Sequence, residues 1–139
     1  MNKISEKELI KCIDETLVID VRGEDFKGGN IINAINIPYE KFNINNFEKI
    51  YIENKKKYII IHCMYSSMRG PGIYKLITKF LKNKNIDINN IFILKDGFFN
   101  FINFVIKNNL LNIIDNYDKK YWIFNNNKYT HLSEIFTNQ

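Results

Sequence analysis

Three short, mainly apolar runs stand out along the chain, and polar residues flank each of them. They cover residues 17–21, 57–62 and 91–94. Runs of this length, rich in Ile and Val, are typical of strands that a parallel sheet buries on both faces. A shorter stretch at 34–38 alternates in polarity and ends at a proline, which also favours a strand.

Helical signals lie between these runs. Ser5 followed by Glu8 is a capping-box pattern, which predicts a helix that begins just after Ser5. Apolar residues recur at helical spacing in 70–81 and 98–109, and more weakly in 39–55. Strands and helices therefore alternate through the first 110 residues, which predicts an α/β fold with a central, mainly parallel sheet flanked by helices.

The C-terminal part of the chain has a different pattern. An aromatic cluster at 121–124 precedes three asparagines and a second polar–aromatic stretch at 128–130. This arrangement favours a hairpin or an extended docking tail. At 139 residues the chain has the size of one domain. We expect one main domain over 1–111 and an extension over 112–139 that packs on it or trails from it.

Charge and cysteine usage exclude several classes of protein. The net charge of +5 comes from scattered lysines, whereas nucleic-acid binding favours a basic stripe rich in Arg. The two cysteines form no disulfide framework, which favours a reducing compartment, the cytoplasm or the nucleus. The polar start argues against a signal peptide, and no apolar run reaches the length of a membrane span. No group of residues has metal-ligand spacing, so we expect no metal.

The composition makes the arginines informative. The chain contains 26 Ile, 22 Asn and 18 Lys but only two Arg, at positions 22 and 69. In a chain that uses Lys for nearly every positive charge, Arg22 and Arg69 are expected where a planar, bidentate guanidinium is needed.

The segment after the strongest predicted strand carries the chemistry. Five residues separate Cys63 from Arg69, and Gly70 and Pro71 open the next helix. In α/β sheets ligands bind beyond the carboxyl ends of the strands. Backbone N–H groups of a tight loop and the helix N-terminus bind an oxyanion there, and Arg69 can hold two of its oxygens. The same field favours a thiolate at Cys63.

Three segments carry a family resemblance. Residues 62–71 resemble the catalytic loop of the M-phase-inducer (cell-division-cycle) dual-specificity phosphatases, whose catalytic domain has the rhodanese fold. Residues 18–31 resemble the small eukaryotic arsenate reductases and their phosphatase-like relatives, a second branch of that superfamily. Residues 94–98 are similar to the turn after the last core strand in both branches. The chain is therefore identified as a rhodanese-superfamily domain.

The resemblance implies a covalent mechanism. Cys63 would form a cysteinyl phosphate or a thiol–arsenate adduct, and Arg69 would stabilise the oxygens. The substrate-binding positions of the loop are Met64, Tyr65, Ser66, Ser67, Met68 and Gly70. Sulfurtransferases of this fold carry a loop one residue shorter, so the span from Cys63 to Arg69 favours phosphate or arsenate.

Supporting roles are expected for three residues. Asp20 and Arg22 are expected to pair and brace the site, with direct substrate contact by Arg22 as the alternative. His62 precedes the cysteine on a strand, so its side chain points away from the ligand by alternation. We expect His62 to make a supporting hydrogen bond rather than to act as a general base.

The chain departs from the cell-cycle enzymes at several positions. Met64 and Met68 stand where those enzymes carry acids proposed as proton donors, and Val21 stands where they carry a second cysteine. Asn30 replaces the usual histidine of the Gly-Gly-His-Ile segment. These departures favour a catalytic domain of the arsenate-reductase type.

The general acid and the substrate stay open. Asp96 follows a parallel strand on the ligand side and is our candidate acid; Glu24 and Asp25 lie in another loop on that side. Solvated loop acids are the alternative for all three. The expected substrate is a small oxyanion, a phosphate ester or a phosphoprotein, and an arsenate reductase would use glutathione and glutaredoxin as reductant. The rivals are a sulfurtransferase and a non-catalytic phospho-binding module. The sequence leaves the oligomeric state open.

Overall fold

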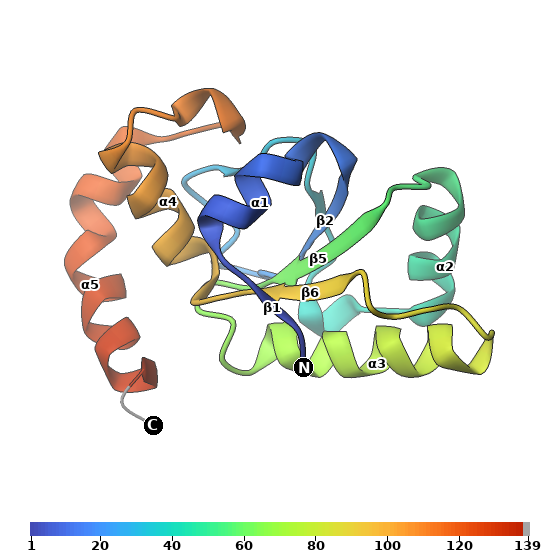
Figure 1. Cartoon of the computed structure of the whole chain (residues 1–139). Coiled ribbons are helices and arrows are strands. Elements are labelled where there is room, and N and C mark those ends of the chain that lie inside the picture. Colours follow the sequence, from blue (N-terminus) through green and yellow to red (C-terminus); the bar gives the residue numbers. More distant parts are fainter. Residues whose placement is uncertain (138–139) are drawn as a thin grey trace.

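A five-stranded parallel sheet forms the centre of the computed structural model, which describes residues 1–137 (Figure 1). The strands lie in the order β1-β6-β5-β2-β4, and every neighbouring pair is parallel. Their bounds are β1 Lys3–Ile4, β2 Thr16–Asp20, β4 Ile35–Asn36, β5 Tyr58–His62 and β6 Ile91–Leu94. The predicted α/β class with a mainly parallel sheet is confirmed. β1 was not predicted, because two residues are too few to set a pattern.

Two pairs of helices cover the two faces of this sheet (Figure 1). Helices α1 (Glu6–Cys12) and α4 (Gly97–Lys107) pack on one face, and α2 (Ile44–Glu53) and α3 (Arg69–Asn83) pack on the other. Successive strand residues point to opposite faces, so both sets of side chains are buried. This double burial explains why the central strands are nearly continuous apolar runs.

The predicted start of α1 is confirmed in detail. Ser5 is the N-cap, its side chain accepts a hydrogen bond from the Glu8 N–H, and the Glu8 carboxylate accepts one from the Ser5 N–H. These reciprocal bonds satisfy two N–H groups that the first helical turn leaves unpaired.

The other short elements within residues 1–137 are a second, small sheet and three helical turns. β3 (Asn30–Ile31) pairs antiparallel with β7 (Ile114–Asp115) in a separate two-stranded sheet. Single 3-10 turns lie at η1 Ile13–Glu15, η2 Tyr39–Lys41 and η3 Leu111–Ile113.

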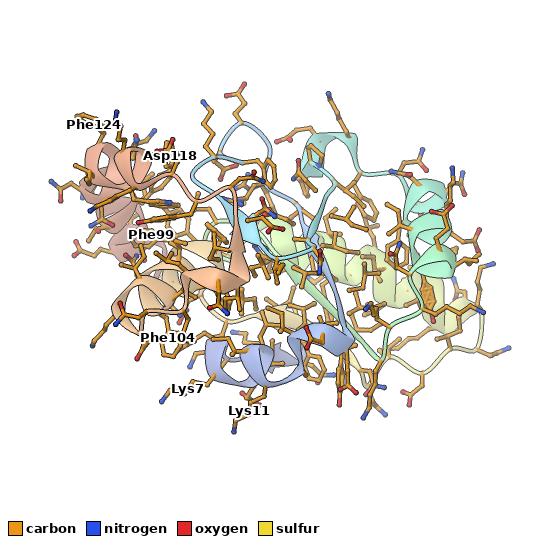
Figure 2. All side chains as sticks on the ribbon, turned by 90° about the horizontal axis from the view of Figure 1, so that it is seen from above. Lys7, Lys11, Phe99, Phe104, Asp118 and Phe124 are labelled. Carbon is orange, nitrogen blue, oxygen red and sulfur yellow. The ribbon has the colours of Figure 1, made fainter. Side chains whose placement is uncertain are left out.

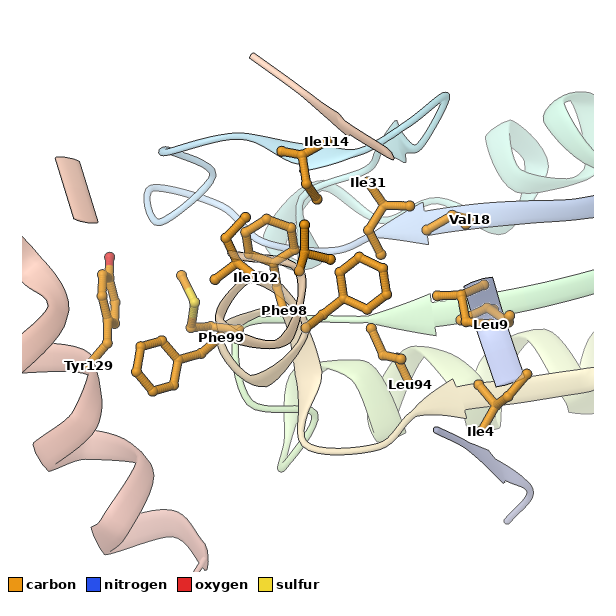
Figure 3. Packing of buried hydrophobic residues seen from close by; sticks show 14 of the residues in the cluster. Ile4, Leu9, Val18, Ile31, Leu94, Phe98, Phe99, Ile102, Ile114 and Tyr129 are labelled. Carbon is orange, nitrogen blue, oxygen red and sulfur yellow. The ribbon is translucent and has the colours of Figure 1, made fainter. Parts of the chain in front are cut away.

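The C-terminal segment is a helix, so the expected hairpin or extended tail is wrong. Helix α5 runs over Lys119–Thr137 and stands at the end of the sheet where β5 and β6 terminate (Figure 1). Trp122 and Tyr129 lie two turns apart on its buried face, and Tyr129 faces Phe99 of α4 (Figure 3). Phe124 lies on the outer face with 82% of its surface exposed (Figure 2). None of the helices in residues 1–137 is long and apolar enough to cross a membrane.

Candidate active site

The loop of residues 63–69, here called the oxyanion loop, connects β5 to α3. Its backbone curls around the sulfur of Cys63. The N–H of Ser66 donates to Sγ at 3.2 Å and the N–H of Gly70 donates at 3.3 Å. Ser66 has a φ of 54°, a left-handed conformation that turns the chain back toward the sulfur. Two backbone amides, one of them in the first turn of α3, therefore point at the sulfur of Cys63.

The turn between β6 and α4 holds this loop from behind. The N–H of Phe98 donates to the Cys63 carbonyl at 3.0 Å, and the N–H of Phe99 donates to the Met64 carbonyl at 2.9 Å. Asp96 and Gly97 both have left-handed φ values, 60° and 71°. The Asp-Gly-Phe turn thus serves as a backbone support for the oxyanion loop.

Gly97→Ala is expected to destabilise the fold by about 1–3 kcal/mol from backbone strain, before any steric cost. A Cβ at this position would lie 2.5 Å from the Met64 carbonyl oxygen, in addition to the positive φ. Chemical denaturation measures the effect. Gly72→Ala is the matched control, because its Cβ would meet the Tyr39 ring at an ordinary 3.5 Å. Equal stability of Gly97→Ala and wild type would show that the turn does not constrain the loop.

A fully buried ion pair lies beneath the site. The carboxylate of Asp20 accepts hydrogen bonds from Arg22 Nε at 3.0 Å and Nη2 at 2.7 Å, and both side chains have no exposed surface. The Arg22 guanidinium also lies 4.0 Å from the centroid of the Phe98 ring. Arg22 is thus held on both sides within the core and does not reach the hollow beside Cys63.

Arg22 also fixes the loop that follows it. Its Nη1 donates to the Asp25 carbonyl at 3.4 Å and the Lys27 carbonyl at 3.3 Å, and its Nη2 donates to the Gly29 carbonyl at 2.8 Å. A single guanidinium therefore holds three carbonyls of the 22–29 loop, which positions the side chain of Asp25.

His62 lies next to this pair. Its Nδ1 lies 3.1 Å from the Cys63 carbonyl, and its ring stacks on Phe98. Nε2 is 3.6 Å from the Asp20 carboxylate, too far for a hydrogen bond. Burial lowers the pKa of His62, although the charge of Asp20 opposes the shift. We therefore describe His62 as a neutral ring behind the loop.

Arg69 is paired across the site with Asp25. Nη1 donates to Oδ1 of Asp25 at 2.8 Å and Nη2 donates to Oδ2 at 2.6 Å, in a bidentate arrangement. Burial by itself would raise the pKa of Asp25, but the hydrogen bonds and charge of Arg69, together with a backbone hydrogen bond and the charge of Arg22, hold that pKa below its ordinary value. The carboxylate thus occupies the two donors with which Arg69 would bind an oxyanion.

A hollow of about 500 Å³ opens over these groups. Its lining is Asp25, Tyr39, Cys63, Tyr65, Ser67, Met68, Arg69, Lys128, Tyr129 and Leu132. Cys63 is only 2% exposed, and its sulfur is reached through this hollow. Helix α5 forms one wall, where Tyr65 donates from its hydroxyl to the Tyr129 carbonyl at 3.1 Å.

The structure brings some candidate residues together and separates others. Cys63, Tyr65, Ser67, Met68 and Arg69 line one hollow. Met64 is fully buried among core residues, so it can contribute to the loop only through its backbone. Ser66 contributes its N–H to the sulfur, while its Oγ is buried without a hydrogen-bond partner.

Asp96 does not line the hollow that contains Cys63. It lines a neighbouring hollow with Lys3, Tyr65, Ser66, Ser67, Ile93, Lys95 and Ser133. Within the part of the chain that the structure describes, Asp25 is the carboxylate that lines the Cys63 hollow. Its role as an acid was left open by the sequence, which does not show that the two loops meet. Sequence reasoning missed Tyr39 and the α5 residues of the wall. Pro38 before Tyr39 marked only a strand end, and the tail carried no helical signal. Within residues 1–137 no group of three or more potential ligands could hold a metal ion.

The chain is similar to known proteins in both sequence and fold. Residues 5–104 match the family model described as a rhodanese-like domain. The chain is 32% identical over 76 residues to "Dual specificity phosphatase ibp1" of Schizosaccharomyces pombe. It is 26% identical over 91 residues to "CDC25-like phosphatase YCH1" of Saccharomyces cerevisiae. The matches cover 55% and 58% of this chain and 55% and 62% of those proteins, so the chain spans less than two thirds of either relative.

Two solved structures share the fold. The As-Sb reductase from Leishmania major superposes with a TM-score of 0.72 at 24% identity, covering 81% of this chain and 83% of that one. Ygr203w of Saccharomyces cerevisiae is described as a homolog of single-domain rhodanese and the Cdc25 phosphatase catalytic domain. It superposes with a TM-score of 0.75 at 21% sequence identity, covering 87% of this chain and 91% of that one. The expected rhodanese-like fold is confirmed.

Proposed function

The chain belongs to the rhodanese-like domain family, and from that premise we propose that it is a cysteine-dependent enzyme acting on a tetrahedral oxyanion. Cys63 is the nucleophile, and Arg69 with the amides of the oxyanion loop binds the oxygens. The first candidate reaction is hydrolysis of a phosphate monoester. The second is the two-electron reduction of arsenate to arsenite, with an external thiol such as glutathione as the reductant. Relatives that carry phosphatase in their names support the first, and the fold of the As-Sb reductase supports the second.

The convergence of donors at one sulfur carries this proposal. Ser66 N–H and Gly70 N–H face Sγ of Cys63, and the guanidinium of Arg69 lines the same hollow. Amides aimed at the sulfur are also aimed toward the oxygens of an anion bound next to it. Donors that need no reorganisation stabilise the charge that develops on those oxygens in the transition state.

The hydrolysis runs in two steps. The Cys63 thiolate attacks phosphorus, an S–P bond forms, and the P–O bond to the leaving group breaks. The leaving oxygen takes the bonding electron pair and a proton. Water then attacks the cysteinyl phosphate, the S–P bond breaks, and inorganic phosphate leaves with the thiolate regenerated.

The size and lining of the hollow favour an ester over a bare oxyanion. A volume of about 500 Å³ lies in the range of sites for organic ligands, and arsenate alone would fill a small part of it. Tyr39, Tyr65 and Tyr129 supply three phenol rings along its walls. Aromatic walls suit an aromatic leaving group, so an aryl phosphate is the expected substrate class.

A parallel assay of the purified protein tests this function. The three reactions are hydrolysis of an aryl phosphate, reduction of arsenate with glutathione and glutaredoxin, and sulfur transfer from thiosulfate to cyanide. We expect turnover of the aryl phosphate, and Cys63→Ser serves as the blank. Sulfur transfer without either oxyanion reaction would overturn the proposal in favour of a sulfurtransferase. Phosphate binding without any turnover would leave a phospho-binding module.

A further inference from the structure

We propose that Asp25 is the proton donor of the reaction and that an oxyanion displaces it from Arg69 on binding. This inference rests on the proposed function. A leaving oxygen that is not already stable as an anion needs a proton, and the methionines at positions 64 and 68 cannot supply one. Among the described residues, Asp25 is the carboxylic acid that shares a hollow with Cys63 and Arg69.

The bond to Arg69 must break when substrate binds. Asp25 accepts hydrogen bonds from both terminal guanidinium nitrogens of Arg69, Nη1 at 2.8 Å and Nη2 at 2.6 Å. A phosphoryl group bound by Arg69 needs the same two donors, so the Asp25 carboxylate and the oxyanion compete for the same pair of N–H groups. Displacement leaves Asp25 beside the bound substrate, because Arg22 holds the 22–29 loop by three of its carbonyls.

Displacement also changes the protonation of Asp25. Burial raises the pKa of this carboxyl, and the hydrogen bonds and charge of Arg69, followed by a backbone hydrogen bond and the charge of Arg22, lower it again. Once Arg69 turns to the oxyanion, burial remains and a negative charge has been added nearby, so the pKa of the carboxyl rises and protonation becomes more favourable. The Gly23 N–H donates to Oδ1 at 3.1 Å, which leaves Oδ2 to carry that proton toward the leaving oxygen.

Other charged and titratable groups surround Asp25. The cations are Arg22, Lys27, Lys41, Arg69 and Lys128. The acids and phenols are Glu24, Glu40, Tyr39, Tyr65, Tyr121 and Tyr129. Two further titratable side chains near Asp25 are Cys63 and the neutral His62. Burial raises the pKa of Tyr65 to about 12, so it stays protonated and adds no charge near neutral pH.

The proton and bond changes balance without a further reactant. In the first step Oδ2 gives its proton to the leaving oxygen as the P–O bond breaks and the S–P bond forms. In the second step the Asp25 carboxylate accepts a proton from water as that water attacks phosphorus and the S–P bond breaks. Asp25 ends protonated beside bound phosphate and loses its proton when phosphate leaves and Arg69 returns.

Two measurements test the assignment, with Asp25→Asn as the variant and Glu24→Gln as the matched control. Glu24 is the neighbouring acid on the same loop and is exposed, whereas both bonds to Arg69 come from Asp25. With Asp25→Asn we expect a loss of about 10²–10⁴-fold on alkyl phosphates and a much smaller loss on aryl phosphates with acidic phenols. Glu24→Gln is expected to change neither rate appreciably.

Calorimetry of tungstate binding supplies a readout that needs no turnover. Tungstate is a tetrahedral dianion that does not titrate near pH 7, and Cys63→Ser removes the thiol from the proton balance. We expect proton uptake on binding in Cys63→Ser, seen as a dependence of the heat on buffer ionisation enthalpy. Addition of Asp25→Asn should abolish that uptake and tighten binding about tenfold, since a charged hydrogen-bonded competitor is lost.

The outcomes separate this inference from the proposed function. Binding without proton uptake, together with unchanged alkyl phosphate rates in Asp25→Asn, would overturn the role of Asp25 and leave Cys63 and Arg69 in theirs. Absence of tungstate binding in both backgrounds would overturn the oxyanion site itself, and the role of Asp25 with it.

Discussion

Cys63→Ser is expected to lower turnover by at least about 10⁴-fold while oxyanion binding persists. A serine hydroxyl is a far weaker nucleophile than a thiolate near neutral pH, and loss of a nucleophile is among the largest single effects in enzyme kinetics. The groups that bind the anion stay in place, because they are the backbone N–H groups of Ser66 and Gly70 and the side chain of Arg69. Initial rates on an aryl phosphate and calorimetric tungstate binding measure the two quantities.

Cys12→Ser is the matched control for this variant. Cys12 lies on α1, where its Sγ contacts the Glu8 carbonyl at 3.4 Å, and it is half-buried outside the hollow. We expect its replacement to leave the rate near that of wild type. Wild-type-like turnover in Cys63→Ser would rule out the covalent mechanism.

Arg69→Lys is expected to lower the rate by about 10²–10³-fold even though the positive charge is kept. The Arg69 fork holds two carboxylate oxygens of Asp25 at 2.8 Å and 2.6 Å, and an oxyanion would take the same place. An ammonium group is a point charge and cannot reproduce this planar pair of bonds. The rate constant at saturating aryl phosphate measures the loss.

Arg69→Ala is the companion variant. If the bidentate geometry matters more than charge, the lysine and alanine variants should be impaired to similar degrees. A lysine variant within a few-fold of wild type would mean that charge alone suffices and that Arg69 is not an oxyanion clamp.

The sequence was most informative where several local signals agreed. An apolar run, then a cysteine, then Arg-Gly-Pro at a helix start predicted β5, the oxyanion loop and α3 together. The scarcity of arginine also proved useful, because Arg22 and Arg69 each hold a carboxylate with two or more bonds. Such signals are local in sequence, so one chain suffices to detect them.

Long-range contacts were beyond sequence reasoning. Asp25 and Arg69 are 44 positions apart, and nothing in either segment shows that the 22–29 loop bends over the oxyanion loop. Asp96 also follows a parallel strand, but its left-handed φ of 60° directs the chain into the support turn.

The prediction for the C-terminal segment was wrong for a different reason. Aromatic and asparagine residues have low helix propensity, so the 119–137 segment carried little local preference for a helix. Its Trp122 and Tyr129 are held by the aromatic side chains of α4, Phe98 and Phe99, and tertiary packing of that kind overrides propensity.

The central claim is that Cys63 becomes covalently phosphorylated during turnover. Acid quenching of wild-type protein during hydrolysis of an aryl phosphate, followed by mass spectrometry of its peptides, tests this most directly. The account predicts one phosphoryl group on the peptide that contains Cys63, absent in Cys63→Ser. A phosphoryl group on a different residue, or brisk hydrolysis by Cys63→Ser with no trapped adduct in wild type, would contradict it.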